Sequence, residues 1–301
     1  MRMWWGIFIS ICLLLCLGCL LRSQYERHHI VTTEYEIASP KLEKAWNGYK
    51  VCFLSDLHNN TYGKCGLKQL EEKIDRVKPD HILIGGDMMC CRIDDMPDFQ
   101  EVEDLICRLA DRYPVIYALG NHEKRMHDYL KEQFAAYEET LHSHGVRFLV
   151  NDSILMYPGK EYAGKTTPIC LSGLDLDWCY YVHKGGIMRM VPGWMEEALG
   201  TSDPSCFNLL LAHSPLYMKE YGEWGADLSL AGHFHGGTIR LPFVGGVMSP
   251  QFQFFCGRDR GRYEEDGKEM IVSGGLGTHS INLRLNNPSE LVVLRFVSQD
   301  K

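Results

Sequence analysis

The sequence predicts an α/β fold that follows one N-terminal membrane-spanning helix. A run of 19 uncharged, mostly apolar residues at 3–21 predicts the helix. Between residues 49 and 119, short apolar runs alternate with amphipathic helical patterns, which is typical of βαβ units. Polar residues that can bind metal ions follow directly after five of the apolar runs along the chain. Together these features indicate an anchor and a domain whose strands end at a common polar site.

The N-terminal segment, residues 1–24, has the composition of a membrane anchor. As a helix, the uncharged run would span about 28 Å, close to one hydrocarbon core. A cleaved signal peptide is the main alternative and a lipidated Cys19 a minor one, but no small-x-small cleavage site follows the run. We therefore expect the anchor to be retained. Basic residues on its two sides are nearly balanced, so the extracytoplasmic location that we favour for the domain has little support.

The composition limits the classes of protein to which the chain can belong. The 301 residues include 31 Lys and Arg against 39 Asp and Glu, a net charge of −8. Residues 1–24 hold two arginines and no acid, so the remaining chain has 29 basic and 39 acidic residues, a net charge of −10. This acidity argues against a nuclease or another nucleic-acid-binding protein. Nine cysteines lie outside the apolar run and form no CxxC pair, so neither a disulfide framework nor a zinc ribbon is expected.

Short runs rich in Val, Ile, Leu and Phe predict buried strands. The polar segment 25–47 is expected to be a juxtamembrane linker with an edge strand at 30–37, and residues 48–301 to form one domain. Within that domain, strands are expected at 49–54, 81–84, 115–119, 146–150, 154–157, 169–174, 207–212, 227–231, 270–273 and 291–297.

Three helices are expected between these strands, because apolar residues recur there at helical spacing. The first covers residues 67–77 and is ended by Pro79, and the second covers residues 99–113. The third covers residues 127–144 and is followed by Gly145, a favourable residue for a helix C-terminus.

Side chains that can bind metals stand at the carboxyl ends of five predicted strands. In α/β sheets these strand ends meet at one edge, where functional sites form, so residues far apart in the sequence are expected to converge there. They are Asp56, His58, Asp87, Asn121, His122, His213, His233 and His235.

Carboxylate, imidazole and amide ligands together suit Mn, Fe or Zn, and no thiolate stands among them. The ligands are too many for one ion, so we expect two divalent ions, with Mn preferred over Fe or Zn. The first ion would be held by Asp56, His58, Asp87 and His235. The second would be held by Asp87, Asn121, His213 and His233. Two ions about 3.5–4 Å apart can clamp a phosphoryl centre and acidify a bridging water into a nucleophile.

In order and approximate spacing, five blocks resemble those of the calcineurin-like metallophosphoesterases. The blocks are Asp56-Leu57-His58, Gly86-Asp87, Gly120-Asn121-His122-Glu123, His213 and Gly232-His233-Phe234-His235, and the resemblance covers about residues 49–297. Segments 236–242, 275–277 and 287–291 are similar to the membrane-anchored YkuE/YaeI-type branch. That branch often has Gln where Thr238 stands and Asp where Glu123 stands.

The resemblance implies a four-layer αββα sandwich with two mixed sheets and a dinuclear metal site at one edge. It also implies hydrolysis of phosphomonoesters or phosphodiesters by a metal-bridging hydroxide. His122 matches the family's non-ligand histidine, which acts on the leaving oxygen, and Glu123 would orient that histidine.

The substrate is marked less clearly than the metal site. Arg240 and His279 are the candidates for substrate contacts. The apolar stretch 241–255 is expected either to pack in the core or to form an acyl-binding or membrane-facing wall. We expect a phosphoester substrate, with a lipid-like ester as one option, contact with a membrane through residues 3–21, and no nucleic acid or identifiable protein partner.

Two alternative functions stay open. One is a pyrophosphatase that acts on UDP-diacylglucosamine-like or other lipid-linked substrates. The other, from a different class, is a catalytically inactive metal-binding protein on the same fold.

Overall fold

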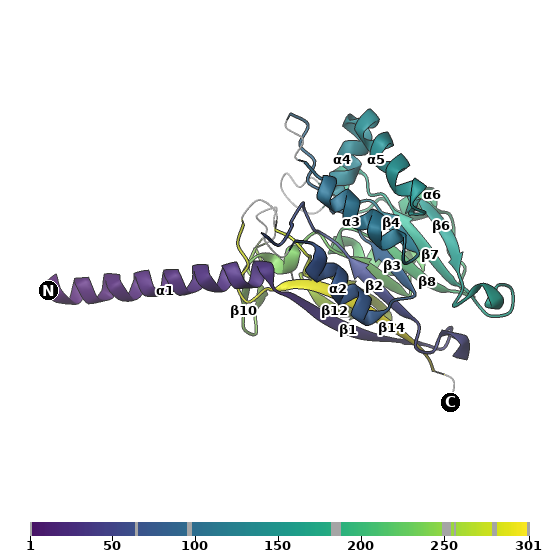
Figure 1. The fold of residues 1–301 in the computed structure, drawn as a ribbon. Helices are drawn as coiled ribbons and strands as arrows, with labels where there is room; N and C mark the ends of the chain where they lie inside the picture. Colours follow the sequence, from purple (N-terminus) through teal and green to yellow (C-terminus); the bar gives the residue numbers. More distant parts are fainter. Residues whose placement is uncertain are drawn as a thin grey trace.

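The computed structural model describes residues 2–63, 66–94, 98–181, 188–248, 254–255, 257–278 and 282–299. Figure 1 shows a long helix, α1 (Arg2–His28), that projects from an α/β body. Residues Trp4–His28 of this helix are long and apolar enough to cross a membrane, and none of that apolar window is buried against the body. The length, composition and exposure of the helix are therefore those expected of a membrane anchor.

The body is built on two six-stranded mixed sheets. In the first, the strand order is β1-β14-β2-β3-β4-β5, and in the second it is β12-β13-β9-β8-β7-β6. The first sheet contains β1 (Ile30–Ser39), β14 (Ser289–Ser298), β2 (Lys50–Leu54), β3 (His81–Ile84), β4 (Val115–Ala118) and β5 (Arg147–Leu149). The second contains β12 (Gly261–Glu265), β13 (Lys268–Val272), β9 (Leu228–Ala231), β8 (Phe207–Ala212), β7 (Ile169–Leu174) and β6 (Asp152–Met156).

The strands that carry the predicted site are parallel within each sheet. Strands β2, β3, β4 and β5 pair in parallel, and so do β7, β8, β9 and β13. Antiparallel pairs occur where β14 meets β2 and at the two edges of the second sheet. Because the parallel strands run the same way within a sheet, their carboxyl ends share one edge.

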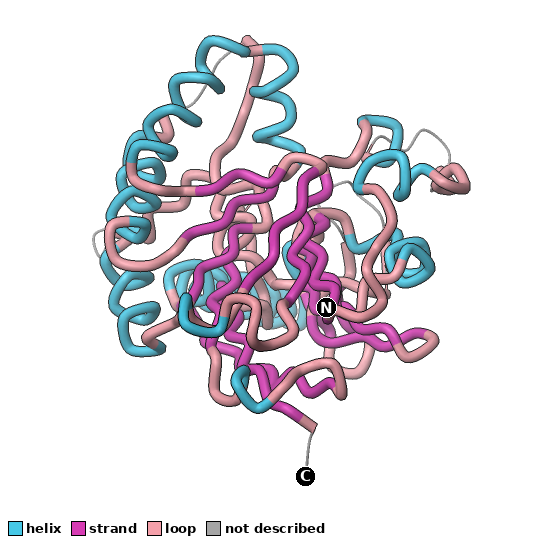
Figure 2. Tube along the Cα trace, turned by 90° about the vertical axis from the view of Figure 1, so that its right-hand side faces the viewer, coloured by secondary structure: helices cyan, strands magenta, loops and turns pink. Residues whose placement is uncertain are grey.

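Helices cover the outer faces of the two sheets, as the tube in Figure 2 makes clear. The first sheet is covered by α2 (Lys68–Val77), α3 (Gln100–Ala110), α4 (Asn121–Tyr129) and α5 (Lys131–Ser143), and the second by α6 (Trp194–Leu199) and α7 (Met218–Trp224). Short 3₁₀ turns occur at Lys44–Trp46, Lys160–Tyr162, Trp178–Tyr180, Pro215–Tyr217 and His235–Gly237, and β10 (Arg240–Leu241) pairs with β11 (Gly245–Gly246).

A separate apolar layer lies between the sheets. Val51 and Phe53 of the first sheet belong to one buried cluster with Leu209, Leu211 and Leu230 of the second. Each such side chain contributes about 1.5–3 kcal/mol when it is fully buried. Helix, sheet, sheet and helix thus form four layers, and the predicted αββα sandwich with two mixed sheets is confirmed.

One expectation about a helix is wrong, and one about an edge strand is confirmed. The helix expected at 127–144 is two helices, since α4 already begins at Asn121 and the chain breaks the helical geometry at Leu130 (φ −128°, ψ 56°). The edge strand expected at 30–37, within the segment 25–47, is present and extends to Ser39. Helix α1 runs to His28, and β1 pairs in parallel with β14 over ten residues as the edge strand of its sheet.

Candidate metal centre

The predicted metal-binding side chains converge at the carboxyl ends of the parallel strands. Asp56 and His58 follow β2, Asp87 follows β3, Asn121 and His122 open α4 two residues after β4, His213 follows β8, and His233 and His235 follow β9. Both sheets therefore supply ligands to the same edge of the molecule.

The backbone at this edge is unusual, because five of these residues adopt left-handed φ angles. They are Asp56 (56°), His58 (48°), Asp87 (54°), His233 (69°) and His235 (50°). Non-glycine residues in this region cost on the order of 1–3 kcal/mol each and cluster at functional sites, where the surrounding structure enforces them. The fold thus holds these side chains in directions that an ordinary strand end would not give.

Close backbone packing explains two of the glycines in the motifs. A Cβ atom on Gly120 would collide with the Asp87 side chain, and one on Gly232 would collide with the carboxylate of Asp56. Glycine at these positions lets the turn after β4 and the turn after β9 approach the carboxylates.

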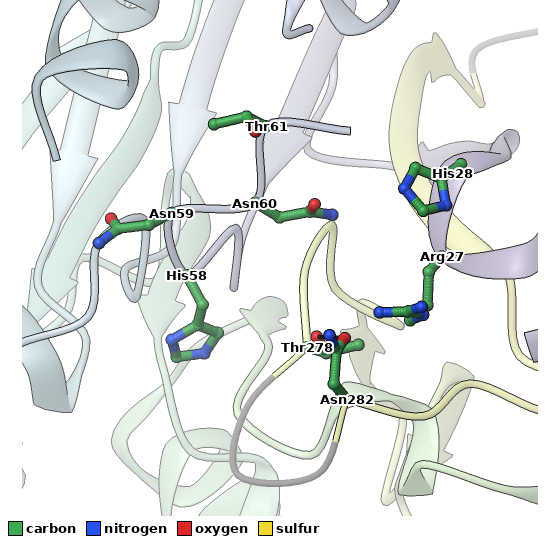
Figure 3. A pocket seen from close by; sticks show the side chains of 8 residues that line it. All are labelled: Arg27, His28, His58, Asn59, Asn60, Thr61, Thr278 and Asn282. Carbon is green, nitrogen blue, oxygen red and sulfur yellow. Dashed lines mark hydrogen bonds between the residues drawn. The ribbon is translucent and has the colours of Figure 1, made fainter. Parts of the chain in front are cut away.

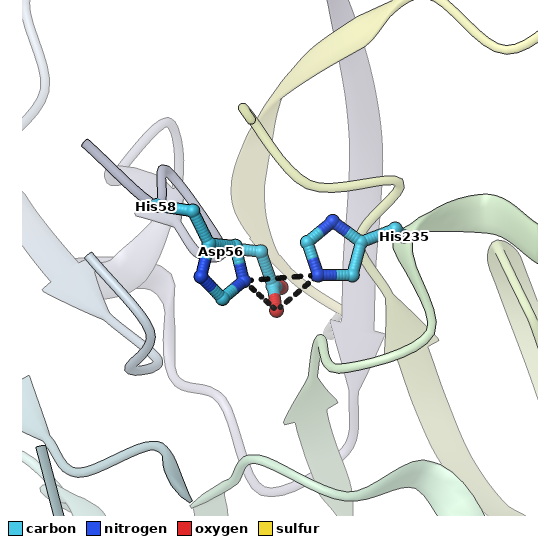
Figure 4. A group of neighbouring side chains, drawn as sticks. All are labelled: Asp56, His58 and His235. Carbon is cyan, nitrogen blue, oxygen red and sulfur yellow. Dashed lines mark hydrogen bonds and ion pairs between the residues drawn. The ribbon is translucent and has the colours of Figure 1, made fainter. Parts of the chain in front are cut away.

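One group of side chains comprises Asp56, His58 and His235, all buried. One ligand atom from each lies within 4.8 Å of the others. Nε2 of His58 is 3.0 Å from Nε2 of His235, and Oδ1 of Asp56 is 3.4 Å from that nitrogen of His235 (Figure 4). Three ligand atoms at this spacing can face a single ion.

A second group comprises Asp87, His213 and His233, again with ligand atoms within 4.8 Å of one another. Oδ2 of Asp87 is 3.1 Å from Nε2 of His213 and 3.7 Å from Nε2 of His58. Asp87 therefore lies between the two groups, as a ligand shared by two ions must. Asp87 and His58 form a further group of this kind with His122.

Two of the imidazole rings are oriented by backbone carbonyls. Nδ1 of His213 is 2.7 Å from the Gly85 carbonyl oxygen, and Nδ1 of His235 is 3.2 Å from that of Gly277. A carbonyl only accepts hydrogen bonds, so in the neutral rings Nδ1 carries the hydrogen. The lone pair is left on Nε2, the nitrogen that faces the site.

Two buried polar atoms at the centre test whether a metal fits. Oδ1 of Asn121 is buried and has no hydrogen-bond partner among the residues that the structure describes, whereas Nε2 of His213 faces only the Asp87 carboxylate, at 3.1 Å. Leaving an atom such as Oδ1 of Asn121 unpaired costs about 1–3 kcal/mol. A divalent cation would satisfy Asn121 and could replace the proton between His213 and Asp87, so the donor set fits a metal centre.

The carboxylates and His213 titrate as a coupled set. Burial raises the pKa of Asp56 to about 6. Burial also opposes ionisation of Asp87, but His213 and His122 outweigh it and hold the pKa of Asp87 well below its ordinary value. For His213 burial is likewise outweighed, and Asp87 raises its pKa to about 10. In the metal-free protein, Asp87 therefore favours the protonated form of His213.

Nδ1 of His122 accepts a hydrogen bond, whereas Nδ1 of His213 and of His235 faces a carbonyl and donates. The Cys91 N–H donates to Nδ1 of His122 over 2.8 Å, so the neutral ring carries its hydrogen on Nε2. The backbone N–H of His122 donates to Oδ1 of Asp87 over 2.8 Å. The centroid of the His122 ring is 5.0 Å from that of the His58 ring. The ring can thus present an N–H donor beside the metal ligands.

The hydrogen bonds of Glu123 indicate a role other than orienting His122. The buried Glu123 carboxylate accepts from the N–H groups of Asp87, Met88 and Gly120, at 2.7, 2.8 and 3.1 Å. It also accepts from the Tyr117 hydroxyl at 2.7 Å. These contacts fix the turn that carries Asp87, while the Cys91 N–H contacts the ring nitrogen of His122.

Some residues that support the ligands were not predicted from the sequence. Sγ of Cys90 is 3.5 Å from Nδ1 of His58, and the Asn287 side chain donates to the His235 carbonyl over 2.6 Å. The buried guanidinium of Arg284 donates to the carbonyls of Gly274 and Gly275, each over 2.9 Å. No local pattern marks these residues, because turns far apart in the sequence bring them to the site.

The structure shows the contacts of only one of the two candidates for substrate contacts. Arg240 donates to Asp259 over 2.9 Å and to the Gly236 carbonyl over 3.1 Å, so its guanidinium braces the loop that follows the ligands. His279 lies outside the described residues. In the stretch 241–255, Leu241, Phe243, Val244, Phe254 and Phe255 are exposed, which contradicts the core-packing interpretation for these side chains.

A cavity of about 410 Å³ opens beside His58 (Figure 3). Its other described lining residues are also polar, and none of them is acidic. They are Arg27, His28, Asn59, Asn60, Thr61, Thr278 and Asn282. The cavity thus connects a predicted metal ligand to the last residues of α1.

The chain matches a family model described as calcineurin-like phosphoesterase over residues 49–237. This segment contains every residue expected as a metal ligand.

Curated relatives are similar over most of the chain. It is 27% identical to the uncharacterized metallophosphoesterase YkuE of Bacillus subtilis (strain 168), over 91% of this chain and 87% of that protein. It is 28% identical to the phosphodiesterase YaeI of Escherichia coli (strain K12), over 83% and 82% respectively. A Danio rerio transmembrane protein with a metallophosphoesterase domain is 27% identical over 86% of this chain, which spans 55% of that protein.

Proposed function

Because this chain belongs to the calcineurin-like phosphoesterase family, we propose that it is a membrane-anchored, dinuclear-metal hydrolase of phosphoesters. The observation that carries the proposal is the pair of ligand groups that meet at Asp87. The names of YkuE and YaeI, a metallophosphoesterase and a phosphodiesterase, support hydrolysis of ester bonds.

The two ions would be held by the ligand sets expected from the sequence, with Asp87 common to both. Asp56, His58 and His235 would complete the first set, and Asn121, His213 and His233 the second. We propose Mn as the metal, with Fe or Zn as alternatives, because the set combines imidazole with oxygen ligands. When bound, two such ions polarise the phosphoryl oxygens and supply a nucleophilic hydroxide at neutral pH.

The chain's own residues would position the ester and donate a proton to the leaving oxygen. His122 carries its hydrogen on Nε2 because Nδ1 accepts from the Cys91 N–H. From there it can donate to the leaving oxygen, a role that general acids typically fill with 10²–10⁴-fold effect. Glu123 acts on this chemistry through the turn of Asp87, and is therefore a positioning residue.

The anchoring part of the proposal rests on α1. Residues 1–24 would hold the protein in a membrane and residues 48–301 would form the catalytic domain, on the extracytoplasmic side in our preferred arrangement. The length and apolar composition of the helix support the anchor, and so does the name of the zebrafish relative.

The experiment is a metal and activity analysis of the purified full chain in detergent. We expect about two Mn per chain by elemental analysis and hydrolysis of bis-p-nitrophenyl phosphate that is lost on chelation. Two bound ions without turnover of any mono-, di- or pyrophosphoester would favour the inactive metal-binding protein. Turnover of pyrophosphoesters alone would favour the pyrophosphatase.

A further inference from the structure

The cavity beside the candidate metal centre is partly lined by the last residues of α1. Arg27 and His28 line it together with His58, and Figure 3 shows the Arg27 guanidinium directed toward Thr278 and Asn282 across the cavity. Nε of Arg27 is buried and has no hydrogen-bond partner among the described residues. Nη2 of Arg27 donates to the Gln24 side chain, and none of the described lining residues is acidic, so the free edge of the guanidinium suits an anionic ligand.

The number of residues between the apolar run and Arg27 sets the position of this cavity relative to the bilayer. Arg27 lies six positions after Leu21, the last residue of the uncharged run. Six residues of helix rise about 9 Å, and the headgroup layer on each side of a bilayer is about 5–8 Å thick. With the run in the hydrocarbon, the cavity lies at the outer edge of the headgroups.

Hydrogen bonds fasten the end of α1 to the loop that supports the metal ligands. The buried Glu26 carboxylate accepts from the Asn287 N–H over 2.8 Å, and the Ser23 hydroxyl accepts from the Arg284 N–H over 3.1 Å. Asn287 in turn donates to the His235 carbonyl over 2.6 Å. The position of the metal centre relative to the helix is therefore fixed by direct contacts.

A second apolar surface lies at the same end of the molecule. The hairpin tip, residues 241–244 between β10 and β11, exposes Leu241, Phe243 and Val244, with Phe243 fully exposed. Figure 1 shows β10 beside the base of α1, at the end from which the helix projects. Exposed aromatic and aliphatic side chains beside an anchor are suited to the interfacial layer of a bilayer.

We infer that the metal site takes its phosphoester from the bilayer that holds α1, so that its substrate class is a lipid-linked phosphoester. The hairpin tip rests in the headgroup layer of that bilayer, and Arg27 contacts the anionic headgroup as it enters the cavity. The inference rests on the proposed function and adds to it the source of the substrate.

The test uses the full chain in vesicles of dioleoylphosphatidylcholine with Mn. The lipid probe is the p-nitrophenyl ester of dioleoylphosphatidic acid, and the soluble probe is ethyl p-nitrophenyl phosphate. In both, water adds to phosphorus, the bond from phosphorus to the aryl oxygen breaks, and p-nitrophenol and a phosphomonoester form. We expect the lipid probe to react at least about tenfold faster in the protein's own vesicles than in separate vesicles, because sharing a surface raises its effective concentration.

The outcomes separate the two proposals. Hydrolysis of the soluble probe, with the lipid probe uncleaved or equally fast in separate vesicles, overturns this inference and leaves the proposed function standing. Hydrolysis of neither probe, nor of bis-p-nitrophenyl phosphate, overturns the proposed function itself.

Substitution of the hairpin tip gives a second test. Phe243 has a φ of 66°, and asparagine tolerates this left-handed backbone, so Phe243→Asn is expected to fold. We expect it to slow the lipid probe about fivefold or more, because an apolar membrane contact is lost, and to leave the soluble probe unchanged. The matched control is Leu155→Asn, an exposed apolar residue of β6, which should change neither rate. Equal rates for the lipid probe in the two variants would contradict the membrane contact.

Arg27→Gln tests the cavity, with His29→Gln as its control. His29 is exposed and stacks on Tyr25, outside the described cavity lining. We expect Arg27→Gln to raise KM for the lipid probe about tenfold with kcat nearly unchanged, as for loss of a charged contact made in ground and transition states alike. A KM equal to that of the control would overturn the role of Arg27.

Discussion

At the residue scale, Asp87 and His122 lie side by side but are expected to do different work. Asp87 lies between the two ligand groups, whereas Nδ1 of His122 is already occupied by the Cys91 N–H. We predict that Asp87→Ala loses both ions, and that His122→Ala keeps them and lowers kcat about 10²–10⁴-fold. Elemental analysis and kinetics on bis-p-nitrophenyl phosphate check this, and equal metal loss in the two variants would refute the division of roles.

A pH dependence follows from the proton on His213. Asp87 raises the pKa of His213 to about 10, so at pH 7 the metal-free ring is charged and must lose a proton before Nε2 can bind an ion. Metal affinity should therefore rise with pH, by about tenfold per pH unit for each proton released, up to the pKa. Calorimetric titration with Mn in buffers of different ionisation enthalpy measures the proton release. An affinity that stays constant from pH 6 to 9 would exclude it.

The convergence of the candidate ligand residues could be predicted from the sequence, but their geometry could not. Asp56, Asp87 and His213 follow apolar strands, and parallel strand ends share an edge, so convergence was foreseeable. The left-handed φ angles of Asp56 and Asp87 come from turns enforced by tertiary packing, and no residue preference announces them. The supporting contact of Cys90 with His58 is hidden for the same reason.

At the scale of elements, the end of α1 is joined to the candidate metal centre through buried hydrogen bonds, of which the one from Asn287 to Glu26 can be tested by substitution. Glu26→Ala removes the acceptor of the Asn287 N–H, and a buried unpaired donor costs about 1–3 kcal/mol. Since Asn287 holds the His235 carbonyl, we predict a drop of about tenfold in Mn affinity, measured by calorimetry.

Two variants control that prediction. Glu26→Gln keeps an acceptor oxygen and should restore most of the affinity. Ser10→Ala changes an exposed residue of the same helix and should leave the affinity as it is. Wild-type affinity in Glu26→Ala would show that the hydrogen bond from Asn287 to Glu26 does not act on the metal affinity.

Elements with a strong local sequence pattern could be predicted, whereas features set by packing or lying at a polar sheet edge could not. Strands β7 and β8 match their predicted bounds, 169–174 and 207–212, because both are mostly apolar and are buried within a sheet. The break between α4 and α5 escaped notice, since Leu130 is neither glycine nor proline and its geometry is set by packing. Strand β12 was missed because this edge strand, Gly261–Glu265, is mostly polar.

At the scale of the whole molecule, the metal centre joins the two sheets. Asp56 and Asp87 come from turns of the first sheet, and His213 and His235 from turns of the second. Ions that bind only the folded state at 100 times their Kd stabilise it by about 2.7 kcal/mol. We predict that chelation lowers Tm by about 5 °C or more in the full chain in detergent. The Asp87→Asn variant should show a much smaller shift, and an equal shift would mean that the stabilising ions bind elsewhere.

The pairing of β1 with β14 has a consequence for the order of folding. β1 follows the anchor helix directly, but its described sheet partner is β14, which also separates it from β2. During synthesis, residues 30–39 must wait for residues 289–298 before their ladder can form, a delay typical of contacts between distant parts of a chain. The first sheet is therefore completed only when nearly all of the chain has been made, and a truncation before residue 289 should leave residues 30–39 without their described partner strand.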